Sequence, residues 1–126
     1  NDSFGHDRGD AVLENVAKSW SEVLRIHDVL GRIGGEEFLI FLPHTDREKA
    51  EVVAGRLLEA TRKLEIPDGK DGIIKITASI GIAIADPDCS KSLTICADKA
   101  LYRAKAEGRD CAVTNAKAPD CCEENQ

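Results

Sequence analysis

The segment GRIGGEEFLIFLP, residues Gly31–Pro43, decides how the middle of the chain folds. Two short apolar runs, Asp28–Ile33 and Phe38–Leu42, flank the pair Gly34 and Gly35. Glycine accepts the positive φ that tight hairpin turns require, and alternating apolar runs around such a turn are typical of strands. The segment therefore predicts a β-hairpin.

Glu36 and Glu37 follow the turn glycines immediately, and their carboxylates allow two interpretations. A magnesium ion held together with substrate phosphates commonly takes one or two protein carboxylates and completes its octahedron with phosphate and water oxygens. A hairpin glutamate and one aspartate at the end of an adjacent strand would form such a site. Alternatively, GGEE is a solvated hairpin tip whose charges oppose aggregation, and this segment taken alone favours that interpretation.

Further helices and strands are predicted on both sides of the hairpin. Apolar residues recur at helical spacing in three stretches: Ala11–Leu24, with its start marked by Gly9 and Asp10; a stretch from a Thr45–Glu48 capping box to Leu64; and Ser92–Glu107, with Gly108 as its C-terminal cap. Two stretches predict strands: the β-branched run Ile73–Ala85 and the short edge strand Cys111–Val113. This order favours an α/β fold, an α+β sandwich in which helices flank a mixed central sheet.

Composition limits what the chain can bind and where it resides. Its 126 residues suffice for one domain, which we assign to residues 1–114, with residues 115–126 as a flexible tail of low apolar content. The net charge of -6 excludes a broad basic surface for a nucleic acid polymer or a membrane, and no apolar run is long enough to span one. The five cysteines form no CxxC pair, so we interpret them as reduced thiols in the cytoplasm.

Four motifs, read in order, identify a family. They are NDSFGHDRGD at 1–10, GRIGGEEF at 31–38, TASIGIA at 77–83 and ADKALYRAKAEGRD at 97–110. Together they resemble the GGDEF family of diguanylate cyclases, with the GGEEF form of its signature. The resemblance implies a fold similar to nucleotide cyclase catalytic cores, GTP as substrate, Mg²⁺ or Mn²⁺ as cofactor and cyclic di-GMP as product. It also implies a homodimer in which the 3′-hydroxyl of one GTP attacks the α-phosphorus of the other.

The opening motif carries the predicted base recognition. Asp10 matches the family aspartate that binds guanine, and a carboxylate can accept the N1-H and N2-H donors of that base together. Asn1 matches the asparagine that contacts the adjacent edge of the ring. From the residues alone, helix capping by Asp10 and ordinary turn chemistry at Asn1 remain alternatives.

The turn and the last helix carry the predicted chemistry of the phosphates. Glu36 matches the metal-binding third letter of the signature, and Glu37 matches the fourth, which is assigned to metal binding or to activation of the attacking hydroxyl. Gly34 and Gly35 match the glycines that let ribose and α-phosphate approach the backbone. Two cations at the end of the last helix match residues that reach the terminal phosphates, although cations also suit a helix C-terminus. They are Lys105 and Arg109.

A second, inhibitory site is implied by the RIHD segment. Arg25 and Asp28 match the family RxxD pair that binds cyclic di-GMP, and Arg25 lies nine residues before Gly34, the usual interval. A guanidinium suits guanine O6 and N7 as well as phosphate. Arg56 matches a secondary arginine that completes such sites, and alone it is an ordinary solvated helix residue.

The family also has a strand before the position of Asn1, with a metal-binding aspartate and a phenylalanine and lysine near the triphosphate, and the sequence lacks these residues. Relative to the family, the domain is therefore N-terminally truncated and lacks its first strand. We expect a diguanylate cyclase, a nucleotidyltransferase that is inhibited by its product at the RxxD site. The alternative is a catalytically impaired regulatory module that binds cyclic di-GMP. A third possibility, an idle dimerisation domain, conflicts with the intact GGEE.

Overall fold

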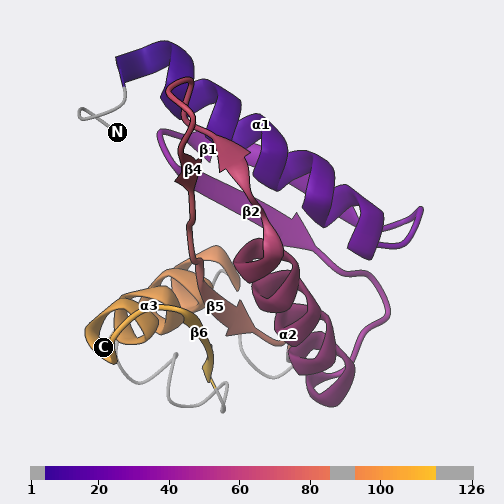
Figure 1. Ribbon diagram of the computed structural model, residues 1–126. Coiled ribbons are helices and arrows are strands. Elements are labelled where there is room, and N and C mark those ends of the chain that lie inside the picture. The colour runs from indigo at the N-terminus through magenta and orange to yellow at the C-terminus, as the bar shows by residue number, and fades with distance from the viewer. Residues whose placement is uncertain (1–4, 86–92, 116–126) are drawn as a thin grey trace. The chain divides into compact units, whose positions relative to one another are not determined.

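The computed structural model describes residues 5–85 and 93–115, which form an α+β fold (Figure 1). The elements, in chain order, are α1 Gly5–Val23, β1 Val29–Gly34, β2 Glu37–Phe41, α2 Arg47–Lys63, β3 Ile66–Pro67, β4 Ile73–Ile74, β5 Ser79–Ala83, α3 Leu93–Ala106 and β6 Cys111–Asn115. The predicted α+β class is confirmed. Within the described residues, however, the strands pair as three two-stranded sheets, β1-β2, β3-β4 and β5-β6, where the sequence predicts one mixed sheet.

The chain divides into two compact units. The first comprises residues 1–44 and 59–76, and the second comprises residues 45–58 and 77–126. In the first unit, short turns join antiparallel strands. In the second, β5 and β6 are parallel, which requires a crossover, and α3 provides it.

Trp20 organises the core of the first unit. Its indole Nε1 donates a buried hydrogen bond of 2.9 Å to the hydroxyl of Thr61, and its ring contacts Phe38 of β2 with centroids 5.5 Å apart. The 55° tilt between the rings suits the aromatic quadrupoles. Trp20 therefore links α1, the hairpin and the end of α2 that belongs to this unit.

Two predicted helix starts differ from the structure. Helix α1 begins at Gly5, so Asp10 lies inside the helix and its interpretation as a cap is wrong. Helix α2 is capped by Asp46, whose carboxylate accepts the amide hydrogen of Lys49 at 2.8 Å, so the predicted Thr45 capping box is also wrong. Aspartate and threonine are both good N-caps, and only the backbone geometry selects one of two neighbours.

The predicted strand Ile73–Ala85 is divided into β4 and β5. The division occurs because β4 pairs antiparallel with β3, whereas β5 pairs in parallel with β6. Asp68 closes the β3-β4 turn by accepting the amide hydrogens of Lys70 and Gly72. This single apolar run thus contributes one strand to an antiparallel pair and a second strand to a parallel pair.

Close packing between α3 and β5 defines the second unit. A Cβ on Gly81 would overlap the carbonyl oxygen of Ala97 and the amide nitrogen of Leu101. The contact is therefore between backbones, and only glycine fits it. The same helix carries Cys96, which is disulfide-bonded, so the prediction of reduced thiols is wrong there, whereas Cys111 is free.

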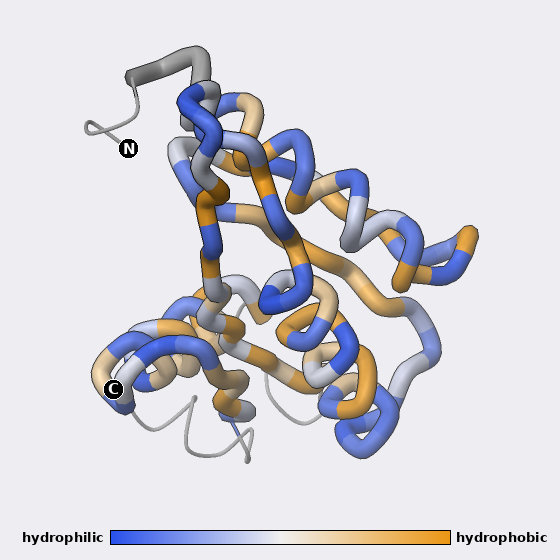
Figure 2. The backbone as a smooth tube through the Cα atoms, viewed as in Figure 1, coloured by the Kyte–Doolittle hydropathy of each residue, from blue (hydrophilic) through white to orange (hydrophobic). Residues whose placement is uncertain are grey.

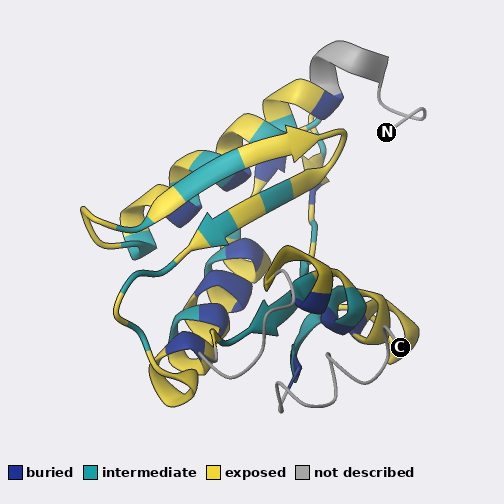
Figure 3. Cartoon of the chain, turned by 180° about the vertical axis from the view of Figure 1, so that it is seen from behind, coloured by how far each residue is buried: buried dark blue, intermediate teal, exposed yellow. Residues whose placement is uncertain are grey.

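Hydrophobic residues occur along both strands of the hairpin (Figure 2), and along β2 exposed and intermediate residues alternate (Figure 3). Phe38 contacts Trp20 on the α1 side. Leu39 and Phe41, which alternate with Phe38 in β2, are 41% and 56% exposed, and Val29, which pairs with Phe41, is 58% exposed. Ile33 of β1 is also exposed, at 55%. No helix among the described residues has the length and apolarity needed to cross a membrane.

Candidate functional site

The β1-β2 turn gives the acidic pair a defined backbone. Gly34 pairs with Glu37 across the hairpin, which leaves Gly35 and Glu36 as the two central turn residues. Gly35 has a φ of 48°, whereas Glu36 is not among the residues with positive φ, the pattern of a type II′ turn. The register is irregular between Arg32 and Gly34. Glycine is thus required at position 35 by conformation, and the hairpin prediction is confirmed.

Glu36 and Glu37 are both exposed at this turn. Within the described residues, neither side chain takes part in a hydrogen bond or an ion pair, so both carboxylates are available to a ligand. Two adjacent carboxylates fit the one or two protein ligands that Mg²⁺ uses when phosphates supply the rest. They do not form a site alone, because the described residues contain no group of three or more His, Cys, Asp or Glu suited to a metal.

Arg32 joins the turn to α1, and it was not among the residues predicted from the sequence. Its Nε donates a hydrogen bond of 3.0 Å to the carbonyl of Gly35, and its Nη2 lies 3.7 Å from Oδ1 of Asp10. Both side chains are solvent-accessible, at 44% for Arg32 and 62% for Asp10. The only signal in the sequence was a cation two positions before the turn glycines. Its two partners, one local and one distant, are visible only in the structure.

Asp10 therefore lies beside the hairpin, on the exposed surface of α1. Its predicted companion in base recognition, Asn1, lies outside the described residues. An open groove of about 280 Å³ lies between α1 and the hairpin; it is lined by Leu13, Glu14, Ala17, Ser21, Leu30, Arg32 and Phe38. Arg32 thus borders this groove as well as the turn and Asp10.

The predicted phosphate cations lie at the C-terminal end of α3, in the second unit. The helix ends in a Schellman motif: the amide of Gly108 donates to the carbonyl of Lys105, and the amide of Arg109 donates to the carbonyl of Ala104. Gly108 has a φ of 112°, which confirms the predicted glycine cap. Lys105 and Arg109 are both exposed, and Arg109 has a left-handed φ of 66°.

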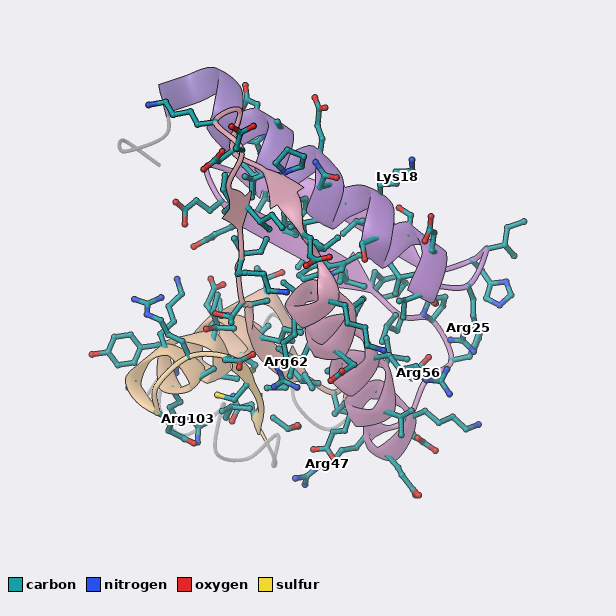
Figure 4. All side chains as sticks on the ribbon, in the orientation of Figure 1. Lys18, Arg25, Arg47, Arg56, Arg62 and Arg103 are labelled. Carbon is teal, nitrogen blue, oxygen red and sulfur yellow. The ribbon has the colours of Figure 1, made fainter. Side chains whose placement is uncertain are left out.

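The RIHD segment forms a tightly bonded turn between α1 and β1, and Figure 4 shows Arg25 on this loop. The Asp28 carboxylate accepts the backbone amide hydrogen of Arg25 at 2.7 Å and two guanidinium hydrogen bonds at 3.4 and 3.3 Å. The Asp28 side chain is 1% exposed, whereas that of Arg25 is 49% exposed. Burial tends to raise the pKa of Asp28, but the hydrogen bonds and charge of Arg25 outweigh it and lower the pKa below the ordinary value.

Arg56, the third predicted residue of this inhibitory site, lies on the exposed surface of α2, within the second unit (Figure 4). The structure thus brings together Arg25 and Asp28, and separately Asp10, Arg32 and the acidic turn.

Comparison with known proteins identifies the family of this chain. The family described as "Diguanylate cyclase, GGDEF domain" matches residues 1–111. The chain belongs to the GGDEF domain family.

Curated relatives agree with this assignment of the GGDEF domain. Diguanylate cyclase A of Treponema denticola is 42% identical over 113 residues, which cover 87% of this chain and 30% of the relative. The probable diguanylate cyclase DgcT of Escherichia coli is 36% identical over 113 residues, which cover 87% of this chain and 25% of the relative. The chain thus spans less than a third of the length of either relative.

Solved structures share the fold of this GGDEF domain. The diguanylate cyclase SiaD of Pseudomonas aeruginosa, solved with its activator SiaC, has a TM-score of 0.83 and 40% identity over 90% of this chain and 44% of that one. The GGDEF domain of DgcB from Caulobacter crescentus, in complex with c-di-GMP, has a TM-score of 0.82 and 26% identity over 93% and 70% of the two chains. An active GGEEF domain from Vibrio cholerae has a TM-score of 0.74 and 32% identity over 93% and 74%.

Proposed function

We propose that this GGDEF domain, residues 1–114 with 115–126 as a tail, condenses two molecules of GTP into cyclic di-GMP. In each of two equivalent steps, a 3′-hydroxyl oxygen bonds to the α-phosphorus of the other nucleotide. The bond to the β-phosphate breaks, pyrophosphate leaves, and the hydroxyl proton passes to a base. The observation that carries the proposal is the exposed acidic turn, which Arg32 connects to Asp10 on α1.

The residues of the chain would divide this work between base, metal and phosphates. Asp10 would accept the guanine donors, while Glu36 and Glu37 would hold Mg²⁺ or Mn²⁺, with Glu37 as the candidate base for the attacking hydroxyl. The cation, when bound, neutralises phosphate charge and orients the reacting oxygens. Lys105 and Arg109 contribute positive charge toward the terminal phosphates, because phosphoryl-type transfer depends mainly on positioning and charge neutralisation.

The reaction also favours a homodimer, and GTP as its substrate favours the cytoplasm as its location. One domain carries one Asp10 and one acidic turn, whereas the reaction joins two GTP molecules, each of which attacks the other. A twofold dimer, in which each domain holds one GTP, meets this requirement. Because the net charge of the chain is negative, an anionic nucleotide has to be held by local groups, and we propose neither a nucleic acid polymer nor a membrane as partner.

Turnover of GTP tests the proposal. With GTP and Mg²⁺, chromatography is expected to show cyclic di-GMP and pyrophosphate when the strand that precedes Asn1 in the family is restored, because that strand carries a metal-binding aspartate. Glu36→Gln and Glu37→Gln should each lower the rate about 100-fold or more, since loss of a charge-stabilising group commonly costs that much. The matched control is Glu22→Gln, an exposed glutamate of α1, which should leave the rate unchanged. Turnover that survives both turn substitutions would contradict the proposal.

A second candidate, a regulatory module that binds cyclic di-GMP, is favoured by the Arg25-Asp28 turn. The turn holds an exposed guanidinium by a nearly buried carboxylate, so the cation is preorganised to meet a guanine edge or a phosphate. In the cyclase this site would provide product inhibition, with Arg56 as the secondary arginine. In a catalytically impaired domain it would be the main function.

Isothermal titration with cyclic di-GMP separates the two candidates. The intact chain is expected to bind, and Arg25→Ala should weaken binding at least about 10-fold because a charge-assisted contact is lost. Arg62→Ala is the matched control, since Arg62 also forms an i,i+3 ion pair, with Glu59. Binding without turnover supports the regulatory module alone, whereas binding that Arg25→Ala leaves unchanged excludes the RxxD site.

A further inference from the structure

One side chain, Arg32, contacts both the acidic turn and the residue proposed to accept guanine. Its Nε bonds the carbonyl of Gly35 at 3.0 Å, which fixes the guanidinium relative to the turn. The same guanidinium extends Nη2 to within 3.7 Å of Asp10 Oδ1. Arg32 also pairs directly with Phe38 in the hairpin ladder, and Phe38 contacts the core residue Trp20. The backbone of Arg32 is thus held in the hairpin and its Nε is held by the Gly35 carbonyl, while its Nη2 faces Asp10.

We propose that Arg32 is a positioning residue for guanine selectivity: it holds the Asp10 carboxylate in the orientation that accepts the N1-H and N2-H donors of guanine. The inference rests on the proposed function, because it assigns GTP to Asp10. It also ties base recognition to the backbone of the turn that presents Glu36.

The chemistry allows the carboxylate to serve both partners. A carboxylate has about four lone-pair sites, so Asp10 can accept two hydrogens from a base while one oxygen faces the arginine. Asp10 is 62% exposed and would otherwise sample several rotamers, which a paired guanidinium restricts. An exposed ion pair adds little to folding stability, so its role is expected to appear in binding.

The geometry also specifies which substitutions separate positioning from charge. Arginine presents several N–H donors in a planar fork, so it can bond a carbonyl through Nε and face a carboxylate through Nη2. Lysine keeps the positive charge but has a single ammonium group, which cannot occupy both places. Arg32→Lys therefore retains the charge and removes the bridge, whereas Arg32→Ala removes both.

Titration of the intact chain with GTP and with inosine triphosphate measures the effect. Inosine offers N1-H but no N2-H, so the ratio of the two affinities reports two-donor recognition by Asp10. Arg32→Ala should lower GTP affinity about 5-fold to 10-fold and inosine triphosphate affinity less, so the ratio falls. Arg32→Lys should restore only part of the ratio. In an Asp10→Asn background, Arg32→Ala should change the ratio no further.

A control variant and three contrary outcomes complete this test. Lys18→Ala, which removes an exposed cation from α1, should leave both affinities unchanged, and circular dichroism should show that each variant is folded. Equal losses for both nucleotides in Arg32→Ala would assign Arg32 to the phosphates and overturn the inference. Unchanged affinities would also overturn it. A native chain that fails to bind GTP would instead contradict the proposed function, and the inference with it.

Discussion

At the scale of single residues, Arg109 shows a conflict between backbone geometry and side-chain identity. It follows Gly108 in the Schellman motif that ends α3, and its φ is 66°. A left-handed conformation costs an L-residue about 1–2 kcal/mol, so glycine would suit the backbone better. An arginine kept at this cost points to a role for its side chain. The proposed contact with the terminal phosphates of GTP is such a role.

Arg109→Gly is therefore expected to raise the free energy of unfolding by about 0.5–1 kcal/mol while it weakens nucleotide binding. Urea denaturation measures the first effect, and titration with GTP and with guanosine measures the second. The loss should be confined to the triphosphate. Lys105→Ala serves as comparison, because it removes a cation without relieving a left-handed φ. Destabilisation by Arg109→Gly, or equal losses for guanosine and GTP, would refute this account.

At the scale of elements, the approach of α3 to β5 explains why the TASIGIA motif contains glycine. The φ of Gly81 lies outside the left-handed range, so its backbone conformation is open to other residues. What excludes a side chain is the backbone of α3 around Ala97 and Leu101. A strand and a helix in direct backbone contact cannot separate to admit a methyl group without loss of their packing.

Gly81→Ala should accordingly lower the free energy of unfolding by about 1–3 kcal/mol through overpacking. The control lies in α2 and in the same unit: Gly55, where an added Cβ would meet no atom within 4 Å. Gly55→Ala should raise stability by about 0.5–1 kcal/mol, because glycine is unfavourable inside a helix. Urea denaturation of the two variants tests the pair. Similar effects of the same sign would show that the contact with α3 does not decide residue 81.

At the scale of the whole molecule, local signals were predictable and long-range ones were not. The hairpin followed from its glycines, and the end of α3 followed from Gly108, because each depends on a few neighbouring residues. The division of Ile73–Ala85 did not, since it arises from pairing with β3 and β6, which are distant in sequence. Residue type alone cannot specify such partners.

In the candidate site, too, local patterns were predictable from the sequence and long-range contacts were not. Motif spacing located Asp10, the acidic turn and the Arg25-Asp28 pair. Arg32 was missed because its contact with Asp10 joins positions 22 residues apart, in a helix and a strand. The burial of the Asp28 side chain, which preorganises the guanidinium of Arg25, likewise could not be predicted from the sequence.

The location of the single tryptophan has a practical consequence. Trp20 lies in the first unit, 6% exposed, against Phe38 and Thr61. Its intrinsic fluorescence is therefore a spectroscopic label for that unit, and a red shift of its emission marks the moment when water reaches the indole. Far-ultraviolet ellipticity records helices from both units. Comparing the two signals during one melt would reveal whether the halves of the chain lose their structure together.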